Sequence, residues 1–308
     1  MQSTAIRIGT RGSPLALAQA EEARRALAAA LGLPADAIAI VPIRTTGDRI
    51  TDRPIAEAGG KGLFTKEIDE ALIDRRIDSG VHSAKDIATR LPDGIVIAAC
   101  LKRGDVRDAL ISPVAKTIAE LPAGAVVGTS SLRRKALVLR NRPDLAIVDL
   151  RGNVDTRLRK IAEGRADATL LAAAGLARLG RIDRVASFLD ADAWVPAPGQ
   201  GTIAVAARAD DAITRERLAM IDDRATSIAL AAERAFLAVL DGSCRTPIGG
   251  LARLDGDRLT FHGMIVKPDG SMAHEVTRSG QADDGERIGA DAARDLAGRG
   301  GPGFFAGD

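Results

Sequence analysis

One pattern occurs twice in this chain of 308 residues: a short apolar run, a Gly-Thr pair, a serine and a helical stretch. It appears as AIRIGTRGSPLALAQA at 5–20 and as AVVGTSSLRRKALVLR at 125–140. A second pair of segments, RIDSGVHSAKDI at 76–87 and RADATLLAAAGL at 165–176, shares Arg-x-Asp and the apolar positions after it. Any two strand–helix units share glycines and apolar strands, and this explains part of the likeness. The pattern nevertheless predicts two similar lobes.

The predicted elements alternate between strand and helix in both lobes, which run from Ala5 to about Leu101 and from about Lys102 to Pro196. Such alternation predicts an α/β fold with mostly parallel sheets. An alanine-rich helix and short strands around a Gly-Asp turn then predict a small third domain with an antiparallel sheet at 218–308. The end of the chain, from Gly298, is too rich in glycine for its order to be predicted.

Composition excludes several classes of protein. The two cysteines, Cys100 and Cys244, are too few for a disulfide framework or a zinc cluster. No apolar run approaches the roughly 18 residues that cross a bilayer, and the first residues lack the apolar core of a signal peptide. The formal net charge is +2 and aromatic residues make up 2% of the chain, which disfavours nucleic-acid binding. We therefore expect a cytoplasmic protein without metal, membrane or nucleic-acid partners.

The two lobes differ where the second pair of segments ends. Lys85 and Asp86 in the first lobe align with Ala174 and Gly175 in the second. Strand ends facing a crevice are where open α/β sheets place ligands. A carboxylate there stabilises a developing cation or holds a proton donor, whereas the alternative is a plain ion pair with Lys85. His82, taken alone, is more typical of a hydrogen-bonded structural histidine.

Arginines accompany the predicted helix starts. Thr10 to Ser13 and Thr129 to Arg134 each combine hydroxyl groups, free backbone N–H groups and arginine side chains, which together favour anion binding. The alternative is helix capping with solvated arginines. In VDLRGNVDTRLRKI at 148–161, an i,i+4 pair between Asp155 and Arg159 explains some of the charges but not Arg151 at the strand edge. Arginines in these positions indicate a substrate with several carboxylates.

The cysteines differ in their surroundings. Cys100 ends an apolar strand and is typical of inert core. Cys244 lies in the loop LDGSCRTPIGG at 240–250, where Arg245 favours the thiolate. Because no nearby histidine forms a cysteine-protease pair, hydrolytic acyl transfer fits poorly.

Six collinear motifs resemble the porphobilinogen deaminase family, also called hydroxymethylbilane synthases. They are IRIGTRGSPLALAQA, GGKGLFTKEIDEALIDRRIDSGVHSAKD, GTSSLRRKALVLR, DLRGNVDTRL, PAPGQGTIAV and GSCRTPIGG. The resemblance implies two hinged lobes of the type II periplasmic-binding-protein kind, 1–101 with about 197–217 and 102–196, besides the third domain. It also implies a transferase of tetrapyrrole (haem) biosynthesis. Four porphobilinogens are deaminated and joined head-to-tail onto a dipyrromethane cofactor, and hydroxymethylbilane is released with water.

The resemblance also assigns residues. It implies that Asp86 is catalytic, hydrogen-bonding pyrrole N–H groups and stabilising the azafulvene cation, and that the cofactor is held by a thioether to Cys244. The side chains implied to contact the cofactor are Lys85, Ser83, Thr129, Ser131, Arg133 and Arg134. Those implied to bind the substrate or the growing chain are Arg11, Arg151, Arg157, Arg178, Gln19 and Phe64. A loop at 60–62 is implied to cover the site.

The chain departs from the family pattern at two places. Gly242-Ser243 precedes Cys244 where many members have two glycines, and Ile87-Ala88 follows Asp86 where methionine or valine and proline are common. Because serine is small, we expect attachment at Cys244 to survive. The family further implies a monomer whose one partner is its small-molecule substrate. The alternative function is a non-catalytic two-lobed anion-binding protein, which needs neither Cys244 nor Asp86.

Overall fold

The computed structural model describes residues 6–49, 64–240 and 246–305. The chain divides into two compact units. Unit 1 comprises 1–104 and 202–227, and unit 2 comprises 105–201 and 228–308. Unit 1 therefore contains the first predicted lobe, whereas unit 2 contains both the second lobe and most of the predicted third domain. The finer division into three domains stays a prediction.

Unit 1 is built on a five-stranded sheet in the order β2-β1-β3-β10-β4. Its strands are β1 (Ile6–Arg11), β2 (Ile38–Ile43), β3 (Ser79–Ser83), β4 (Ile95–Cys100) and β10 (Ile203–Arg208). Strand β1 is parallel to β2 and β3, whereas β10 runs antiparallel between β3 and β4. The alternating pattern in the sequence thus forms a mostly parallel sheet, as predicted.

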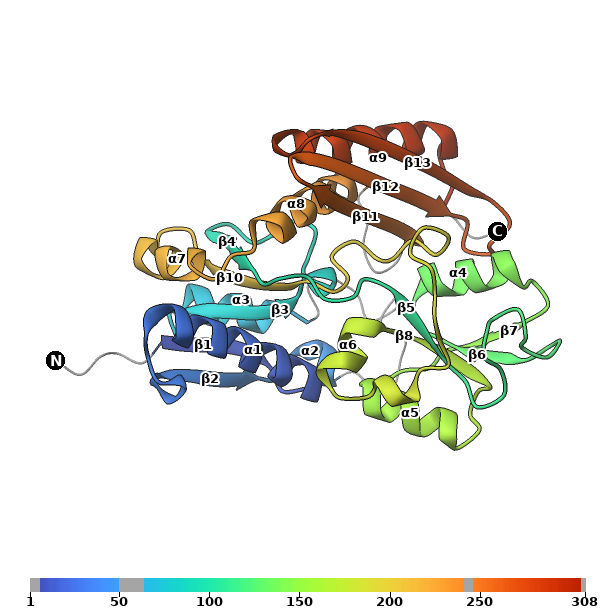
Figure 1. Cartoon of the computed structure of the whole chain (residues 1–308), viewed down its shortest axis with the longest axis horizontal. Coiled ribbons are helices and arrows are strands. Elements are labelled where there is room, and N and C mark those ends of the chain that lie inside the picture. Colours follow the sequence, from blue (N-terminus) through green and yellow to red (C-terminus); the bar gives the residue numbers. More distant parts are fainter. Residues whose placement is uncertain (1–5, 50–63, 241–245, 306–308) are drawn as a thin grey trace. The chain divides into compact units, whose positions relative to one another are not determined.

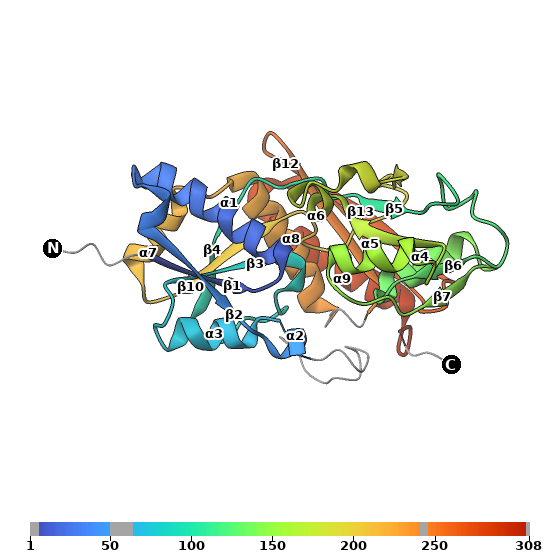
Figure 2. The ribbon, with the colours of Figure 1, turned by 90° about the horizontal axis from the view of Figure 1, so that it is seen from below.

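Helices cover both faces of this sheet (Figure 2). Helix α1 (Pro14–Leu31) begins as predicted, with the Ser13 hydroxyl accepting a hydrogen bond from the Ala16 N–H at 3.3 Å. It packs on the face that carries Ile203 and Val205, and α3 (Lys66–Ile73) packs on the opposite face. The shorter elements of the unit are η1 (Ala35–Ala37), α2 (Thr46–Arg49), η2 (Ala84–Asp86) and α7 (Ala212–Ala219).

The second lobe, residues 105–201 of unit 2, repeats this arrangement. Its sheet order is β7-β6-β8-β5-β9, with β6 parallel to β7 and β8 and with β5 antiparallel to β8 and β9. The strands are β5 (Asp108–Ile111), β6 (Val126–Gly128), β7 (Ala146–Val148), β8 (Ala168–Ala172) and β9 (Ser187–Phe188). Helix α4 (Leu132–Asn141) packs on one face, and α5 (Val154–Ala162) and α6 (Ala173–Arg178) pack on the other. A short η3 (Ile182–Arg184) precedes β9.

The strand register explains the sequence repeat. Ile8 pairs with Ser79 in unit 1, and Val127 pairs with Ala168 in the second lobe. The aspartate of each Arg-x-Asp accepts a hydrogen bond from the first parallel strand: Asp78 from the Arg7 N–H at 2.8 Å, and Asp167 from the Val126 N–H at 2.7 Å. The shared aspartates therefore form equivalent hydrogen bonds between the paired strands of each lobe. The two lobes are similar, as predicted.

The remainder of unit 2 is a three-stranded antiparallel sheet, which confirms the predicted fold class. Its strands are β11 (Ile248–Asp255), β12 (Arg258–Val266) and β13 (Ala273–Gln281), and α8 (Arg224–Val239) begins in unit 1 and continues into it. After η4 (Ala282–Asp284), α9 (Gly285–Gly300) lies along β12 and β13 (Figure 1). The sequence left the order of the residues from Gly298 open; α9 extends to Gly300, and Phe304 is buried in the core of this sheet.

Candidate functional site

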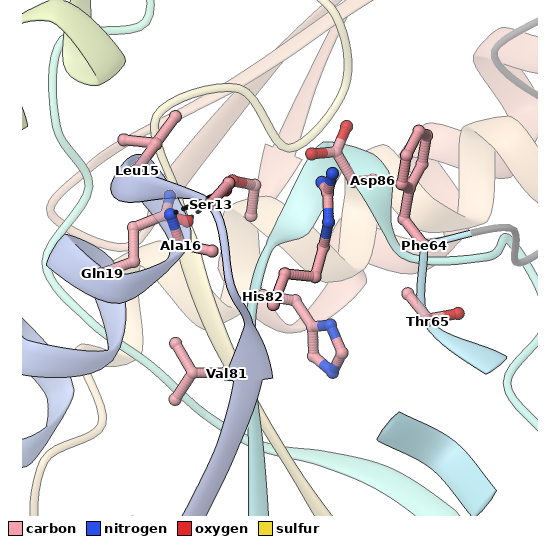
Figure 3. Close-up of a pocket in the computed structure, with 11 residues that line it drawn as sticks. Ser13, Leu15, Ala16, Gln19, Phe64, Thr65, Val81, His82 and Asp86 are labelled. Atoms are coloured by element: carbon pink, nitrogen blue, oxygen red, sulfur yellow. Dashed lines mark hydrogen bonds between the residues drawn. The ribbon is translucent and has the colours of Figure 1, made fainter. Parts of the chain in front are cut away.

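Unit 1 has a pocket at the point where several of its elements end or begin (Figure 3). The end of β1, the first turns of α1, the end of β3 with η2, and the residues before α3 all contribute to it. Its lining residues are Arg11, Ser13, Leu15, Ala16, Gln19, Phe64, Thr65, Val81, His82, Ser83 and Asp86. The pocket is open to solvent, and the empty space in and around it is about 390 Å³.

Five of the residues predicted to act in the site meet in this pocket: Arg11, Gln19, Phe64, Ser83 and Asp86. The guanidinium carbon of Arg11 lies 4.2 Å from the centre of the Phe64 ring, a cation–π contact. The Ser83 hydroxyl donates a hydrogen bond to Gln19 Oε1 at 3.0 Å. A cation, an anion and neutral hydrogen-bonding groups therefore share one pocket within unit 1.

Of the charged pair Lys85 and Asp86 identified in the sequence, only Asp86 lines the pocket. Asp86 is half-buried at the end of η2 and lines the pocket, whereas the half-buried Lys85 does not. The short turn of η2 explains this difference, because consecutive residues of a 3₁₀ turn point in different directions. Lys85 also has contacts of its own elsewhere.

The structure makes His82 a member of the site, which sequence reasoning missed. Its side chain lines the pocket and the residue is 6% exposed. The expectation of a hydrogen-bonded structural histidine is wrong, because neither ring nitrogen has a hydrogen-bond partner among the residues that the structure describes. Burial, and then the positive charge of Arg11, lower the pKa of His82 to about 4.

The residues predicted to bind anions in the second lobe surround the start of α4. Ser131 caps this helix by accepting a hydrogen bond from the Arg134 N–H at 3.4 Å. The Thr129 hydroxyl accepts one from the Ser131 N–H at 3.1 Å. Both hydroxyl groups thus stabilise the turn, and Ser131 has the capping role that the alternative interpretation gave it.

Arg133 and Arg134 are buried around Asp108. Their Nη2 atoms each lie 2.7 Å from one carboxylate oxygen of this aspartate, which is fully buried. Trp194 Nε1 and Gln200 Nε2 donate to the same carboxylate at 3.1 and 2.9 Å. Burial alone raises the pKa of a carboxyl, but the two guanidinium groups hold the pKa of Asp108 below its usual range.

This buried cluster carries one uncompensated positive charge, from two arginines and one aspartate. The Nη1 atoms of Arg133 and Arg134 donate to the carbonyl oxygens of Val195 and Leu170 at 2.9 and 2.8 Å. The Nε atom of each arginine is buried without a hydrogen-bond partner within 6–49, 64–240 and 246–305. Sequence reasoning missed Asp108; its only sequence signal is a charge at the start of an apolar strand, DALI.

The three arginines of the second lobe that were predicted to bind the substrate, Arg151, Arg157 and Arg178, are half-buried. Arg157 Nε donates to the Gly152 carbonyl at 2.8 Å, and Arg178 Nη2 donates to the Gly201 carbonyl at 3.1 Å. The Arg151 carbonyl accepts a hydrogen bond from Lys160 at 3.0 Å.

The expected pair between Asp155 and Arg159 is wrong. Asp155 instead pairs with Arg181 at 3.0 Å, and Arg159 pairs with Glu163 at 3.6 Å. The i,i+4 ion pair of Arg159 is therefore formed with Glu163. Asp155 forms its ion pair with Arg181, in the segment after α6.

The predicted cofactor anchor, Cys244, and the predicted covering loop at 60–62 lie outside the described residues. Cys100 is 1% exposed and belongs to the core, as expected. In the described part of the chain, no group of three or more His, Cys, Asp or Glu side chains is arranged to hold a metal ion. Nor is any helix there long and apolar enough to cross a membrane.

Comparison with known families matches nearly the whole chain. Residues 6–216 match the family model described as "Porphobilinogen deaminase, dipyromethane cofactor binding domain". Residues 227–298 match "Porphobilinogen deaminase, C-terminal domain". Similar solved structures include a periplasmic substrate-binding protein of an ABC transporter from Coxiella burnetii (16% identity, TM-score 0.43, 70% of this chain and 90% of that chain). Another is the methionine-binding protein MetQ (16% identity, TM-score 0.44, 70% and 89%).

Two curated relatives are much more similar to this chain. The porphobilinogen deaminase of Nitrobacter hamburgensis is 56% identical over 298 residues, covering 97% of this chain and 94% of the relative. That of Nitrobacter winogradskyi is 57% identical over 298 residues, with the same coverage. With both family models in their expected order and more than half of the residues identical, this chain belongs to the porphobilinogen deaminase family, transferases that carry a dipyrromethane cofactor.

Proposed function

We propose that this enzyme deaminates porphobilinogen in the pocket of unit 1, with Asp86 as its catalytic residue. The observation that supports this most directly is the position of the Asp86 carboxylate, half-buried at the end of η2 in a pocket with Arg11, Gln19 and Phe64. Four porphobilinogens are joined head-to-tail, and hydroxymethylbilane is released with water. A non-catalytic anion-binding protein needs no carboxylate in this pocket and is not favoured.

Asp86 has two tasks in this reaction. Its carboxylate accepts a hydrogen bond from the pyrrole N–H of the substrate and so orients the ring. When the bond between the aminomethyl carbon and nitrogen breaks, the pyrrole becomes a cationic azafulvene, and the negative charge of Asp86 stabilises that cation. Because the pocket removes part of the solvent around Asp86, the stabilisation is stronger than in water.

The substrate also carries an acetate and a propionate group, which need cationic partners. In unit 1 we assign Arg11, whose guanidinium stacks on Phe64, to bind one of these carboxylates, together with Gln19. In unit 2 we assign the same task to Arg151, Arg157 and Arg178. Replacing Arg151 by leucine is expected to stall elongation, so that an enzyme–substrate complex with an incomplete chain accumulates and is seen by native gel or intact mass. Unchanged product formation would make Arg151 a surface charge only.

The residues present fit a cofactor that bears carboxylates. The excess positive charge on Arg133 and Arg134 and their unpartnered Nε atoms favour a nearby anion. We assign the hydroxyl groups of Ser83, Thr129 and Ser131 and the ammonium of Lys85 to the same group, and the thiolate of Cys244 to its covalent attachment. When bound, the dipyrromethane supplies the primer to which the first substrate is joined.

Intact mass tests the proposed attachment. The purified enzyme is expected to exceed its sequence mass by the mass of two pyrrole units and to colour with Ehrlich's reagent. The variant Cys244→Ser is expected to lose both, whereas the matched variant Cys100→Ser retains them because Cys100 is core. An enzyme at its unmodified sequence mass would contradict the proposal. By family resemblance we also propose that the enzyme acts in the cytoplasm and that it is a monomer. Light scattering of the loaded enzyme tests the monomeric state.

A further inference from the structure

His82 is a buried polar side chain without a structural task. The residue is 6% exposed, and its ring nitrogens have no hydrogen-bond partner in the described ranges 6–49, 64–240 and 246–305. Neither nitrogen is among the side-chain atoms that are fully buried without a partner in these ranges. The ring lines the pocket in which Asp86 lies, so its nitrogens are open to whatever occupies that pocket. A side chain of this kind points to a ligand that supplies the missing partner.

The scaffold itself does not require a histidine at this position. His82 lies opposite Ala204 on β10, and the equivalent residue of the second lobe, Leu171, lies opposite Ala109 on β5. Leu171 is 4% exposed and packs with Leu158 of α5 as ordinary core. An apolar side chain therefore satisfies the packing of the same fold.

Unit 1 also makes room for the ring. A Cβ atom added to Gly80 would lie 3.0 Å from His82 Nε2 and 2.9 Å from Ile68 Cγ2. The equivalent residue of the second lobe is a threonine, Thr169, beside the leucine. The glycine thus leaves the space on the α3 side of the sheet that the imidazole needs.

The charge state of the ring narrows what it binds. Burial and the charge of Arg11 keep the pKa of His82 near 4, so the ring is neutral at physiological pH. A neutral imidazole has one nitrogen that accepts a hydrogen bond and one N–H that donates. It therefore accepts from a cation without the repulsion that a charged histidine would produce.

We propose that His82 accepts a hydrogen bond from the aminomethyl ammonium of porphobilinogen and holds the leaving nitrogen in place. This inference rests on the proposed function of the pocket. The proposed arginines supply charge for the two substrate carboxylates and Asp86 supplies charge for the pyrrole cation, so the polar group still without a partner is the ammonium. His82, four residues before Asp86 and lining the same pocket, is the neutral acceptor for it.

The step balances without a co-reactant. The carbon–nitrogen bond breaks, both electrons of that bond leave with the nitrogen as ammonia, and the positive charge remains on the pyrrole ring. No proton passes to His82, because the ammonium is a far weaker acid than an imidazolium with a pKa of about 4. His82 orients the bond that breaks and then releases a neutral product.

The test compares two substrates in two variants. His82→Leu introduces the residue of the second lobe, and His82→Gln retains a neutral acceptor. Each is assayed with porphobilinogen and with the analogue whose aminomethyl group is replaced by hydroxymethyl. We expect His82→Leu to lower kcat/KM for porphobilinogen about 10- to 100-fold, the usual effect of a lost hydrogen bond to a charged group. The analogue lacks the ammonium, so its kcat/KM, or its inhibition constant if it is not turned over, should change much less.

The other outcomes are distinct. Equal losses for both compounds in His82→Leu would overturn the inference, as would unchanged kcat/KM for porphobilinogen. If His82→Leu does not fold, the same two compounds are compared in His82→Gln. Retention of kcat/KM for porphobilinogen supports the inference, because glutamine also accepts a hydrogen bond. Equal losses for both compounds overturn it. The matched control is His262→Leu, since His262 pairs with Glu275 in the sheet of β11–β13 and should affect neither compound. A wild-type enzyme that carries primer but does not deaminate porphobilinogen would instead refute the proposed function.

Discussion

The two lobes have the same strand arrangement but place their polar residues on different strands. In unit 1 the polar side chains lie at the end of β3, where His82, Ser83 and Asp86 face a pocket. The equivalent positions at the end of β8 and in α6 are Leu171, Ala172 and Gly175. On the neighbouring antiparallel strand the difference is reversed, because the second lobe has Asp108 where unit 1 has Ile203.

The comparison separates two uses of buried polarity. Asp108 in the second lobe is satisfied by Arg133, Arg134, Trp194 and Gln200, so its polar groups are closed off from the surroundings. In unit 1, His82 and Asp86 instead line a pocket. The carboxylate of Asp108 thus holds two arginines in fixed positions, whereas that of Asp86 is presented to a ligand.

The largest expected effect on stability comes from opening the closed cluster. Asp108→Asn removes the charge that neutralises two buried guanidinium groups, and loss of one partner of a buried ion pair costs about 3–5 kcal/mol. We expect urea denaturation of the whole enzyme to show a free energy of unfolding that is lower by this amount in the variant. Ile203→Val at the equivalent position of unit 1 is the matched control, with an expected loss of about 0.5–1.5 kcal/mol. Equal losses in the two variants would mean that the Asp108 cluster is not the stabilising feature of the second lobe.

A smaller effect concerns the acid stability of unit 1. The pKa of His82 is about 4 in the fold and about 6.5 in an unfolded chain, so the unfolded state binds more protons between these values. Unfolding free energy should therefore fall as pH drops from about 6.5 to 4.5, by about 2–3 kcal/mol from this group. His82→Leu should lose that dependence, measured as unfolding free energy at pH 7.5 and 4.5. An identical pH dependence in both proteins would show that His82 is not buried in its neutral form.

Asp69 on α3 is expected to act in the opposite direction and more weakly. Burial raises the pKa of its carboxyl to about 6, so the folded state binds more protons than the unfolded state between about pH 4 and 6. Stability gained from this group on acidification partly offsets the loss from His82. Asp69→Asn should raise the unfolding temperature at pH 7.5 but not at pH 4.5, by an amount equivalent to about 2 kcal/mol. A rise of the same size at both pH values would contradict the buried carboxyl.

Much of the fold could be predicted from the sequence because the repeated residues form the same hydrogen bonds in both lobes. Asp78 and Asp167 make the same bond to the first strand of their lobes, so Arg-x-Asp recurs at equivalent positions. Strand β13 could not be predicted in this way. Its residues are mostly exposed or half-buried, and they lack the regular alternation of a strand with one buried face.

The site was predicted where a single segment carries its chemistry, as in Ser83 to Asp86. It was missed where partners come from distant segments. Asp108 meets Arg133 across 25 residues and Trp194 across 86, and no local pattern reports such pairs. The role proposed for His82 also depends on the finding that no described residue bonds its ring, which becomes visible only when the neighbours of His82 are placed.

The most direct test of the central claim, that unit 1 carries the chemistry, is the release of ammonia in a single turnover by Asp86→Asn. The variant is to be loaded with primer, verified by intact mass, and mixed rapidly with porphobilinogen. Removal of the stabilising charge is expected to slow ammonia release by at least about 10²–10³-fold, with the primer mass and the unfolding temperature unchanged. Ammonia release at the wild-type rate from the loaded variant would contradict the account.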